Sequence, residues 1–181
     1  MEPTEITAGR LHLRPYTVSD IDAVYAGCQD PDIQRWTTVP VPYTRAHAQG
    51  YVEANTVEGW RAGTGDSFAV VDSVSNELLA SIGVVRLDVE GSVAEIGYWV
   101  VPDARGKGVA TQAVQIVSRW AFEELGMARL EWLAAVGNDA SRRVAEKAGF
   151  TVEGVLRAKI ANRDGTREDA WIGSLLPEDL R

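Results

Sequence analysis

Residues 94–121 read AEIGYWVVPDARGKGVATQAVQIVSRWA and predict a strand, a short loop and a helix in direct succession. The strand is expected over residues 94–101, where apolar and aromatic residues suit a mostly buried, pleated segment. Pro102 ends it, because proline has no N–H to give to a central ladder. From 109 to 121 the apolar residues recur at helical spacing, which indicates a helix with a broad apolar face packed on a sheet.

The loop between them is Arg105-Gly106-Lys107-Gly108-Val109-Ala110. Its glycines let the backbone approach a ligand closely, and the free N–H groups at the start of the next helix face the loop. Arg105 and Lys107 add positive charge, so the loop is expected to bind a phosphate or pyrophosphate. It is not a dinucleotide fingerprint, which needs glycine where Thr111 stands. It is not a Walker loop either, because that loop needs Ser or Thr directly after Gly-Lys, whereas Lys107 is followed here by Gly108 and Val109.

The composition is that of an ordinary globular protein, with 45% apolar and 24% charged residues in 181, and we expect one domain over 1–181. A net charge of −8 argues against nucleic acid and favours a cationic amine as substrate. No membrane-spanning run or signal peptide is apparent, and Cys28 is the single cysteine, so a cytoplasmic location is expected, with Cys28 as buried filler. His12 and His47 are far apart without other ligands nearby, so we expect no metal site.

The rest of the chain predicts an α/β fold whose mixed, mostly antiparallel sheet has about seven strands flanked by about four helices. The expected strands are 11–14, 66–72, 78–87, 94–101, 129–136, 151–160 and 167–175, and the expected helices are 18–28, 44–61, 109–121 and 141–148. The strand–helix–strand order over 94–136 implies a parallel pair joined by a right-handed crossover. Residues 29–44, with three prolines, are expected to form a loop that exposes Trp36 and Tyr43, either to bind substrate or merely to pin the loop.

The pattern Arg-x-x-Gly-x-Ala at 105–110 resembles the pyrophosphate loop Gln/Arg-x-x-Gly-x-Gly/Ala of the GCN5-related N-acetyltransferases (GNAT). The flanking segments AEIGYWVVPDARGKGVATQA and NDASRRVAEKAGFTVEGVLR look like the branch that contains the RimJ/RimL ribosomal-protein alanine acetyltransferases. LHLRPYTVSDIDAVY near the start and EDAWIGSLLPED near the end extend the resemblance over nearly the whole chain.

This resemblance implies that the central strand and the strand after the central helix splay apart to admit the pantetheine arm of acetyl-CoA. The arm would bond to backbone around Trp99, Val100 and Val101, and the pyrophosphate would lie on residues 105–110. An N–H near Val100 would polarise the thioester carbonyl as its oxygen gains charge. The alternative is that Val100 and Val101 are plain core residues.

A protonated amine must lose a proton before it attacks, and Glu95 is the candidate acceptor. It is the only charged residue in an otherwise apolar strand, where burial would raise its proton affinity. The alternative is a glutamate that faces solvent or pairs with an arginine on a neighbouring strand. Glu153 and Asp169, on the closing strands, are further candidates.

Many members of the superfamily protonate the leaving thiolate with a tyrosine four residues before a Gly-Phe pair. Here the pair is Gly149-Phe150 and that position is Ala145, so the usual acid is absent. The resemblance to the RimJ/RimL branch supplies Asn138 and Ser141, which match its Asn-x-x-Ser segment. Asn138 would bind the pantetheine arm, cap a helix, or do both, and Ser141 would bind the sulfur or relay a proton.

The expected function is therefore transfer of an acetyl group from acetyl-CoA to a primary amine, by direct attack in a ternary complex. The acceptor could be a protein N-terminus or a small-molecule amine. The sequence shows no Cys or Ser nucleophile paired with a His, which agrees with direct transfer rather than an acyl-enzyme. The alternatives are another acyl group such as succinyl, a non-catalytic CoA-binding sensor or partner module, and a nucleotide-phosphate enzyme. The resemblance also leaves a homodimer open.

Overall fold

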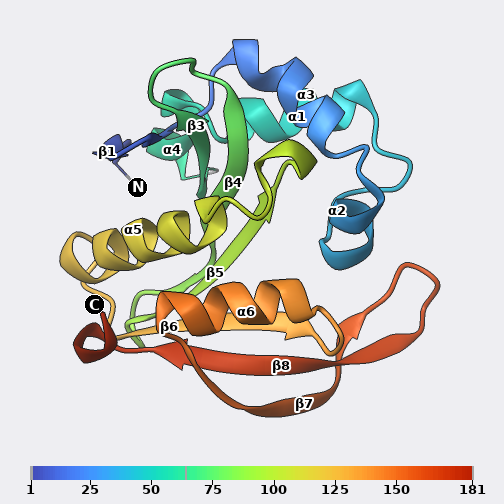
Figure 1. The fold of residues 1–181 in the computed structure, drawn as a ribbon, viewed down its shortest axis with the longest axis vertical. Helices are drawn as coiled ribbons and strands as arrows, with labels where there is room; N and C mark the ends of the chain where they lie inside the picture. The colour runs from blue at the N-terminus through green and yellow to red at the C-terminus, as the bar shows by residue number, and fades with distance from the viewer. Residues whose placement is uncertain (1, 64, 181) are drawn as a thin grey trace. The chain divides into compact units, whose positions relative to one another are not determined.

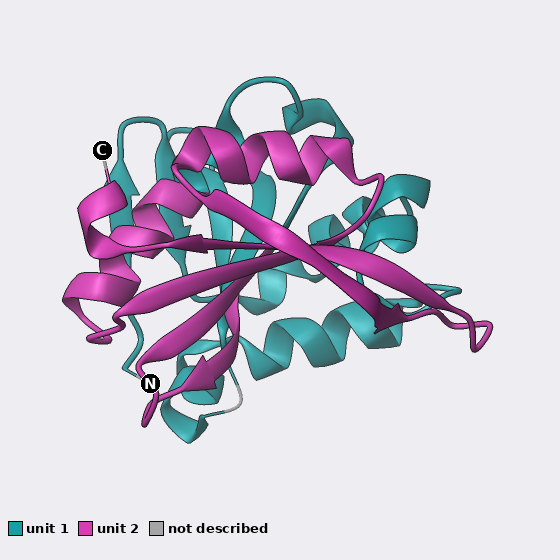
Figure 2. Cartoon of the chain, turned by 90° about the horizontal axis from the view of Figure 1, so that it is seen from below, with its two compact units in different colours: residues 1–83, 98–113 teal, residues 84–97, 114–181 magenta. Residues whose placement is uncertain are grey.

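The computed structural model describes residues 2–63 and 65–180, which hold eight strands and six α-helices (Figure 1). They form two compact units, residues 1–83 with 98–113 and residues 84–97 with 114–181, called unit 1 and unit 2 below (Figure 2). Two strands and one helix, β4 (Leu78–Asp88), β5 (Val93–Val100) and α5 (Val109–Glu123), contribute residues to both units.

Unit 1 contains an antiparallel sheet with the order β1-β2-β3-β4. Its other strands are β1 (Ile6–Ala8), β2 (Leu11–Arg14) and β3 (Ser67–Asp72), and every residue of β3 is buried. The hairpin between β1 and β2 turns at Gly9, whose φ of +60° is a conformation that glycine adopts without steric cost. β1 is not predicted from the sequence, because three residues are too few to display an alternating pattern.

The helices of unit 1 correct three expectations for this part of the chain. The expected loop 29–44 contains α2 (Pro31–Trp36), which has Asp30 at its N-cap. The expected helix 44–61 is two helices, α3 (Arg45–Ala54) and α4 (Val57–Ala62), because the chain breaks at Asn55. The Asn55 side-chain oxygen accepts the N–H groups of residues 66 and 67, while Thr56 starts α4 as its N-cap. The expected helix 18–28 is the 3-10 turn η1 (Val18–Asp20) followed by α1 (Ile21–Gly27).

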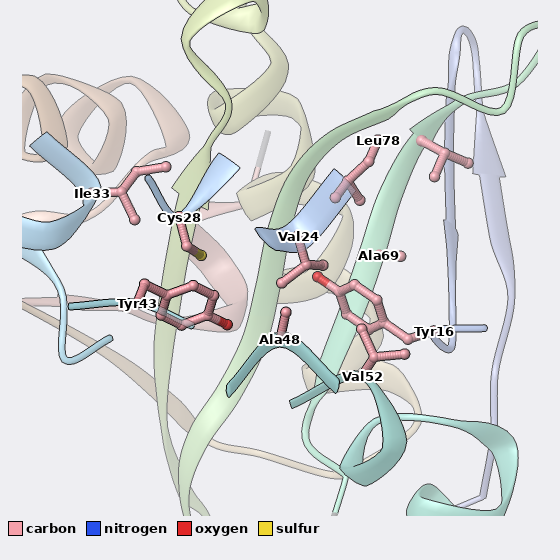
Figure 3. Packing of buried hydrophobic residues seen from close by; sticks show 10 residues of the cluster. Tyr16, Val24, Cys28, Ile33, Tyr43, Ala48, Val52, Ala69 and Leu78 are labelled. Atoms are coloured by element: carbon pink, nitrogen blue, oxygen red, sulfur yellow. The ribbon is translucent and has the colours of Figure 1, made fainter. Parts of the chain in front are cut away.

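The apolar core of unit 1 gathers side chains from β3, β4, α1, α2 and α3 (Figure 3). Cys28 is 1% exposed in this core, which confirms that it is buried filler. Tyr43 lies next to it and is 6% exposed, so the expectation that Tyr43 is exposed on a loop is wrong. The aromatic ring anchors the segment after α2 to the core, because burying it removes a large apolar area from water.

Unit 2 contains the rest of β4 and β5 together with β6 (Arg129–Ala135), β7 (Thr151–Ala161) and β8 (Arg167–Leu175). The strands are ordered β4-β5-β6-β8-β7. β5 and β6 are parallel, with three residue pairs from Val93↔Arg129 to Glu95↔Glu131, and β8 is antiparallel to both of its neighbours. The helix α6 (Asp139–Ala148) ends at Gly149, whose φ of +111° is left-handed. The 3-10 turn η3 (Pro177–Asp179) follows β8, and a second 3-10 turn, η2 (Pro102–Ala104), follows β5 and belongs to unit 1.

The predicted fold class is confirmed: a mostly antiparallel sheet with one parallel pair, and helices between the strands. The differences are additions within this class, since β1, α2 and the division of one expected helix bring the described residues to eight strands and six α-helices. None of these helices is both long and apolar enough to cross a bilayer.

Candidate active site

The glycine-rich loop lies between η2 and α5 in unit 1, and its residues 105–108 are exposed. Gly106 and Gly108 have φ values of +74° and +81°, and a Cβ added to either would meet nothing within 4 Å. Glycine is therefore required here by the backbone conformation rather than by crowding. The first turn of α5 begins with the bond from the Gln112 N–H to the Gly108 carbonyl, 3.0 Å long. The N–H groups of residues 109–111 precede this bond and have no partner inside the helix, so they are suited to binding an anion.

Lys107 brings a cation to the rim of a cavity of about 400 Å³ within unit 1. Val109 and Gln112 line the same cavity, together with Arg10 and Glu77 from the hairpins of the sheet. The loop thus combines backbone N–H groups, a lysine and a hollow that has room for part of a ligand.

Arg105, which the sequence predicts as a cation of the anion site, contacts two carboxylates and a backbone carbonyl in this structure. Its guanidinium lies 2.5 Å from a carboxylate oxygen of Asp30 and 3.3 Å from one of Asp32, and its Nε donates to the Val100 carbonyl at 3.3 Å. Two carboxylates therefore offset its charge, and Lys107 is left as the cation of the loop that faces the cavity. The Asp30-Pro31 pair is typical of a helix start, but no local pattern indicates that Asp30 also contacts Arg105.

The backbone hydrogen bonds after Trp99 show which of the expected coenzyme-binding N–H groups are already used by a neighbouring strand. The Val101 N–H donates to the Leu79 carbonyl at 3.0 Å, so it is used by the neighbouring strand. Because successive residues of a strand direct their backbone groups to opposite edges, the N–H of Val100 points away from that neighbour. The side chains of Trp99 and Val101 pack against Gly27 of α1, where an added Cβ would lie 3.3–3.4 Å from them.

Glu95 lies on β5 within unit 2, with a side chain that is 21% exposed. Burial raises the pKa of its carboxyl above the ordinary value, and the negative charge of Glu131 raises it further, against the opposing effects of Arg86 and Lys159. Arg86 is its nearest cation, at 4.0 Å from Nε to Oε2, which is too long for a hydrogen bond. A half-buried carboxylate with a raised pKa is suited to accepting a proton.

The two further carboxylates that the sequence offered are less suited to this task. Glu153 binds Arg129 at 2.6 Å and accepts the Ser174 hydroxyl at 2.7 Å, and these contacts lower its pKa to about 2. Asp169 is exposed on β8 and accepts the Ala158 N–H at 2.7 Å. Both carboxylates are held by structural contacts.

Asn138 and Ser141 lie at the start of α6 in unit 2. The Asn138 side-chain oxygen accepts the Ser141 N–H at 3.2 Å, which confirms that Asn138 caps the helix and leaves its amide N–H groups for other partners. The Ser141 hydroxyl oxygen accepts the indole N–H of Trp132 at 3.0 Å. The sequence could not indicate Trp132, because the contact joins β6 to α6 through tertiary packing. Ala145, in the position of the missing tyrosine, is 1% exposed.

Trp36 ends α2 in unit 1 and is partly buried, with the guanidinium of Arg35 4.4 Å from its ring centre. Unit 1 therefore holds Trp36, Tyr43 and the backbone from Trp99 to Ala110, and unit 2 holds Glu95, Asn138 and Ser141.

Comparison with known proteins gives one consistent picture. A family model described as an acetyltransferase (GNAT) domain matches residues 10–151. The putative ribosomal N-acetyltransferase YdaF of Bacillus subtilis is 44% identical over 80 residues, a match that spans 44% of this chain and 44% of YdaF. The uncharacterized N-acetyltransferase YoaA of B. subtilis is 27% identical over 92% of this chain and 93% of its own length. The crystal structure of a GNAT-family acetyltransferase from Bacillus anthracis superimposes with a TM-score of 0.84 at 25% identity, covering 97% of this chain and 99% of that one.

Proposed function

The chain belongs to the GNAT acetyltransferase family and is an N-acetyltransferase that depends on acyl-CoA, and we propose that it transfers the acetyl group of acetyl-CoA directly to a primary amine. The exposed glycine loop with its unpartnered helical N–H groups is the observation that carries this proposal. β4, β5 and α5 run through both compact units, which supports residues 1–181 acting as one acyltransferase domain.

The diphosphate of acetyl-CoA would bind the backbone of residues 106–110 and the Lys107 ammonium group. Left-handed Gly106 and Gly108 open this backbone to a ligand, since a side chain at either position would strain it. The Val100 N–H and the amide of Asn138 would hold the pantetheine arm. Val101 contributes no N–H, because Leu79 already accepts it.

In the reaction, the neutral amine nitrogen bonds to the thioester carbonyl carbon, the carbon–sulfur bond breaks, and the sulfur leaves with the electron pair. The nitrogen then loses one more proton to become the amide, and this loss balances the proton that converts the thiolate to the free thiol. Glu95 would take the proton of the ammonium group first, a role that its raised pKa supports. The Val100 N–H would stabilise the oxyanion. The Ser141 hydroxyl would bind the sulfur as its charge grows, oriented by the bond it accepts from Trp132.

The acceptor we propose is a cationic primary amine, either a protein N-terminus or a small molecule. The formal net charge of −8 attracts such a substrate, and one relative is named a putative ribosomal N-acetyltransferase. Trp36, at the end of α2, is the proposed contact for the acceptor, and buried Tyr43 would support this segment from the core. We place the reaction in the cytoplasm, since the single cysteine is a buried free thiol.

The test is thiol release from acetyl-CoA over a panel of primary amines, with wild type and Glu95→Gln. We expect amine-dependent release by the wild type, with one mole of acetylated amine per mole of thiol, and strongly reduced release by the variant. Stabilisation by CoA without thiol release for any amine would overturn the proposal in favour of a CoA-binding module. Release with succinyl-CoA in preference to acetyl-CoA would overturn the assigned acyl group.

A further inference from the structure

Asp30 and Arg105 connect two parts of unit 1 that lie 75 residues apart in the chain. Arg105 donates from Nη2 to Oδ1 of Asp30 at 2.5 Å and from Nη1 to Oδ2 at 3.4 Å. The Asp30 side chain is 13% exposed, compared with 68% for Asp32, the second carboxylate at this guanidinium. The two-point contact with Asp30 is thus partly shielded from water, and it fixes the plane of the guanidinium as well as its position.

The same carboxylate also begins α2. Oδ1 of Asp30 accepts the Ile33 N–H at 2.9 Å, as the N-cap of the helix that carries Trp36. Burial raises the pKa of Asp30, but the bonds from Arg105 and Ile33 outweigh it, so the pKa is lowered and the carboxylate stays charged. One side chain therefore fixes both the start of α2 and the guanidinium.

Arg105 carries this constraint to the end of β5, because its Nε donates to the Val100 carbonyl at 3.3 Å. Its donors at Nε, Nη1 and Nη2 all face protein oxygens. A guanidinium held in this way fixes the position of the loop backbone that follows it. The backbone N–H groups of the loop and Lys107 then remain to bind an anion.

We infer that Asp30 is a positioning residue of the transfer reaction, which acts through Arg105 to hold the coenzyme loop and Val100 in their binding arrangement and to couple them to α2. This inference rests on the proposed function, because it takes residues 105–110 as the coenzyme site. It concerns a side chain outside that loop, which would touch neither substrate.

Variants of Asp30 separate its two tasks. Asp30→Asn and Asp30→Ser keep a good N-cap but lose the charged fork to Arg105, whereas Asp30→Ala loses both. We expect the calorimetric Kd for CoA and the KM for acetyl-CoA to rise about tenfold in all three variants, the effect of losing one charge-assisted hydrogen bond. In an Arg105→Gln background, Asp30→Asn should change the Kd by less than about twofold, because the partner is already gone.

Asp22→Asn is the matched control, since it removes an exposed ion pair with Arg45 elsewhere in unit 1. It should leave the Kd for CoA unchanged, as expected for an exposed pair. If Asp30→Asn and Asp30→Ser bind CoA like the wild type while Asp30→Ala does not, Asp30 is only a helix cap and the inference is overturned. Additive effects of Asp30→Asn and Arg105→Gln would also overturn it. A wild type without affinity for CoA would instead refute the proposed function, so the two failures are distinguishable.

Discussion

The indole N–H of Trp132 on β6 donates to the hydroxyl oxygen of Ser141 in the first turn of α6, at 3.0 Å. Trp132 is 1% exposed, so water does not replace this partner when it is lost. Accepting the bond occupies one side of the Ser141 oxygen and restricts the directions in which the hydroxyl proton points. Ser141 therefore presents an oriented hydroxyl at the start of α6.

Replacing Ser141 tests the role proposed for that hydroxyl. Ser141→Ala should lower kcat about tenfold, the effect of one hydrogen bond to a developing thiolate. It should also cost about 1–2 kcal/mol in the free energy of unfolding, because the buried Trp132 N–H loses its acceptor. Ser141→Thr keeps the hydroxyl and should retain most of kcat. Steady-state kinetics and urea unfolding measure both effects, and an unchanged kcat in Ser141→Ala would exclude Ser141 from the reaction.

Glu95 should control the acidic limb of the pH profile. A base must be deprotonated to act, so kcat/KM should fall as the pH drops through the raised pKa of Glu95, which lies above its ordinary value of 4.5. Glu95→Gln should remove this limb and lower kcat about 100-fold, within the usual range for a general base. A variant with the same profile as the wild type would show that another group or water accepts the proton.

Glu131→Gln provides a matched variant next to this carboxylate. Glu131 pairs with Glu95 in the parallel register, and its charge raises the pKa of Glu95. Removing that charge should move the acidic limb to lower pH, because the like-charge repulsion is relieved. If the acidic limb of the kcat/KM profile lies at the same pH in Glu131→Gln as in the wild type, the limb does not reflect titration of Glu95.

Gly108→Ala tests the conformation of the loop apart from its charge. The φ of +81° costs a residue with a side chain about 1–2 kcal/mol, although no neighbour lies within 4 Å of the added Cβ. The loop should relax away from this conformation and weaken CoA binding about tenfold. Gly50→Ala, at an equally open position in α3, should leave CoA affinity unchanged and stabilise the helix by up to about 1 kcal/mol. Equal CoA affinity in both variants would contradict the need for a left-handed glycine.

Glu153 should contribute to stability at neutral pH and lose that contribution in acid. Hydrogen bonds from Arg129 and Ser174 lower its pKa from 4.5 to about 2 in the folded protein. A lowered folded-state pKa stabilises the fold above the unfolded value, and the gain disappears as the pH falls from about 4.5 towards about 2. Since the side chain is 40% exposed, solvent screening limits the gain to about 1 kcal/mol. Glu153→Gln should lower the free energy of unfolding by this amount at pH 7 and by less at pH 3, and a difference that persists undiminished in acid would contradict the assignment.

The central strand–loop–helix could be predicted from sequence because its signals are local. The apolar and aromatic residues of β5, the stop at Pro102 and the helical period of α5 are each visible within a short stretch of sequence. Asn138 as the cap of α6 was predictable for the same reason. The resemblance to a family added the coenzyme and the reaction, which spacing alone does not specify.

The contacts that were not predicted involve residues whose surroundings come from distant parts of the chain. The contact of Arg105 with Asp30, 75 residues away, was not predicted. Tyr43 sits between prolines and polar residues in the sequence, yet its ring lies in the core of unit 1. The partner of Ser141 is an indole on another strand. Tertiary packing decides such contacts, and no local pattern reports them.

The most direct test of the account is a calorimetric titration of CoA into the wild type and into Lys107→Glu. Saturable binding to the wild type at one site, weakened about tenfold or more by the reversed charge, is the result that a diphosphate on the loop 105–110 requires. Absence of measurable affinity for CoA and acetyl-CoA in the wild type, or equal affinity in the variant, would contradict it.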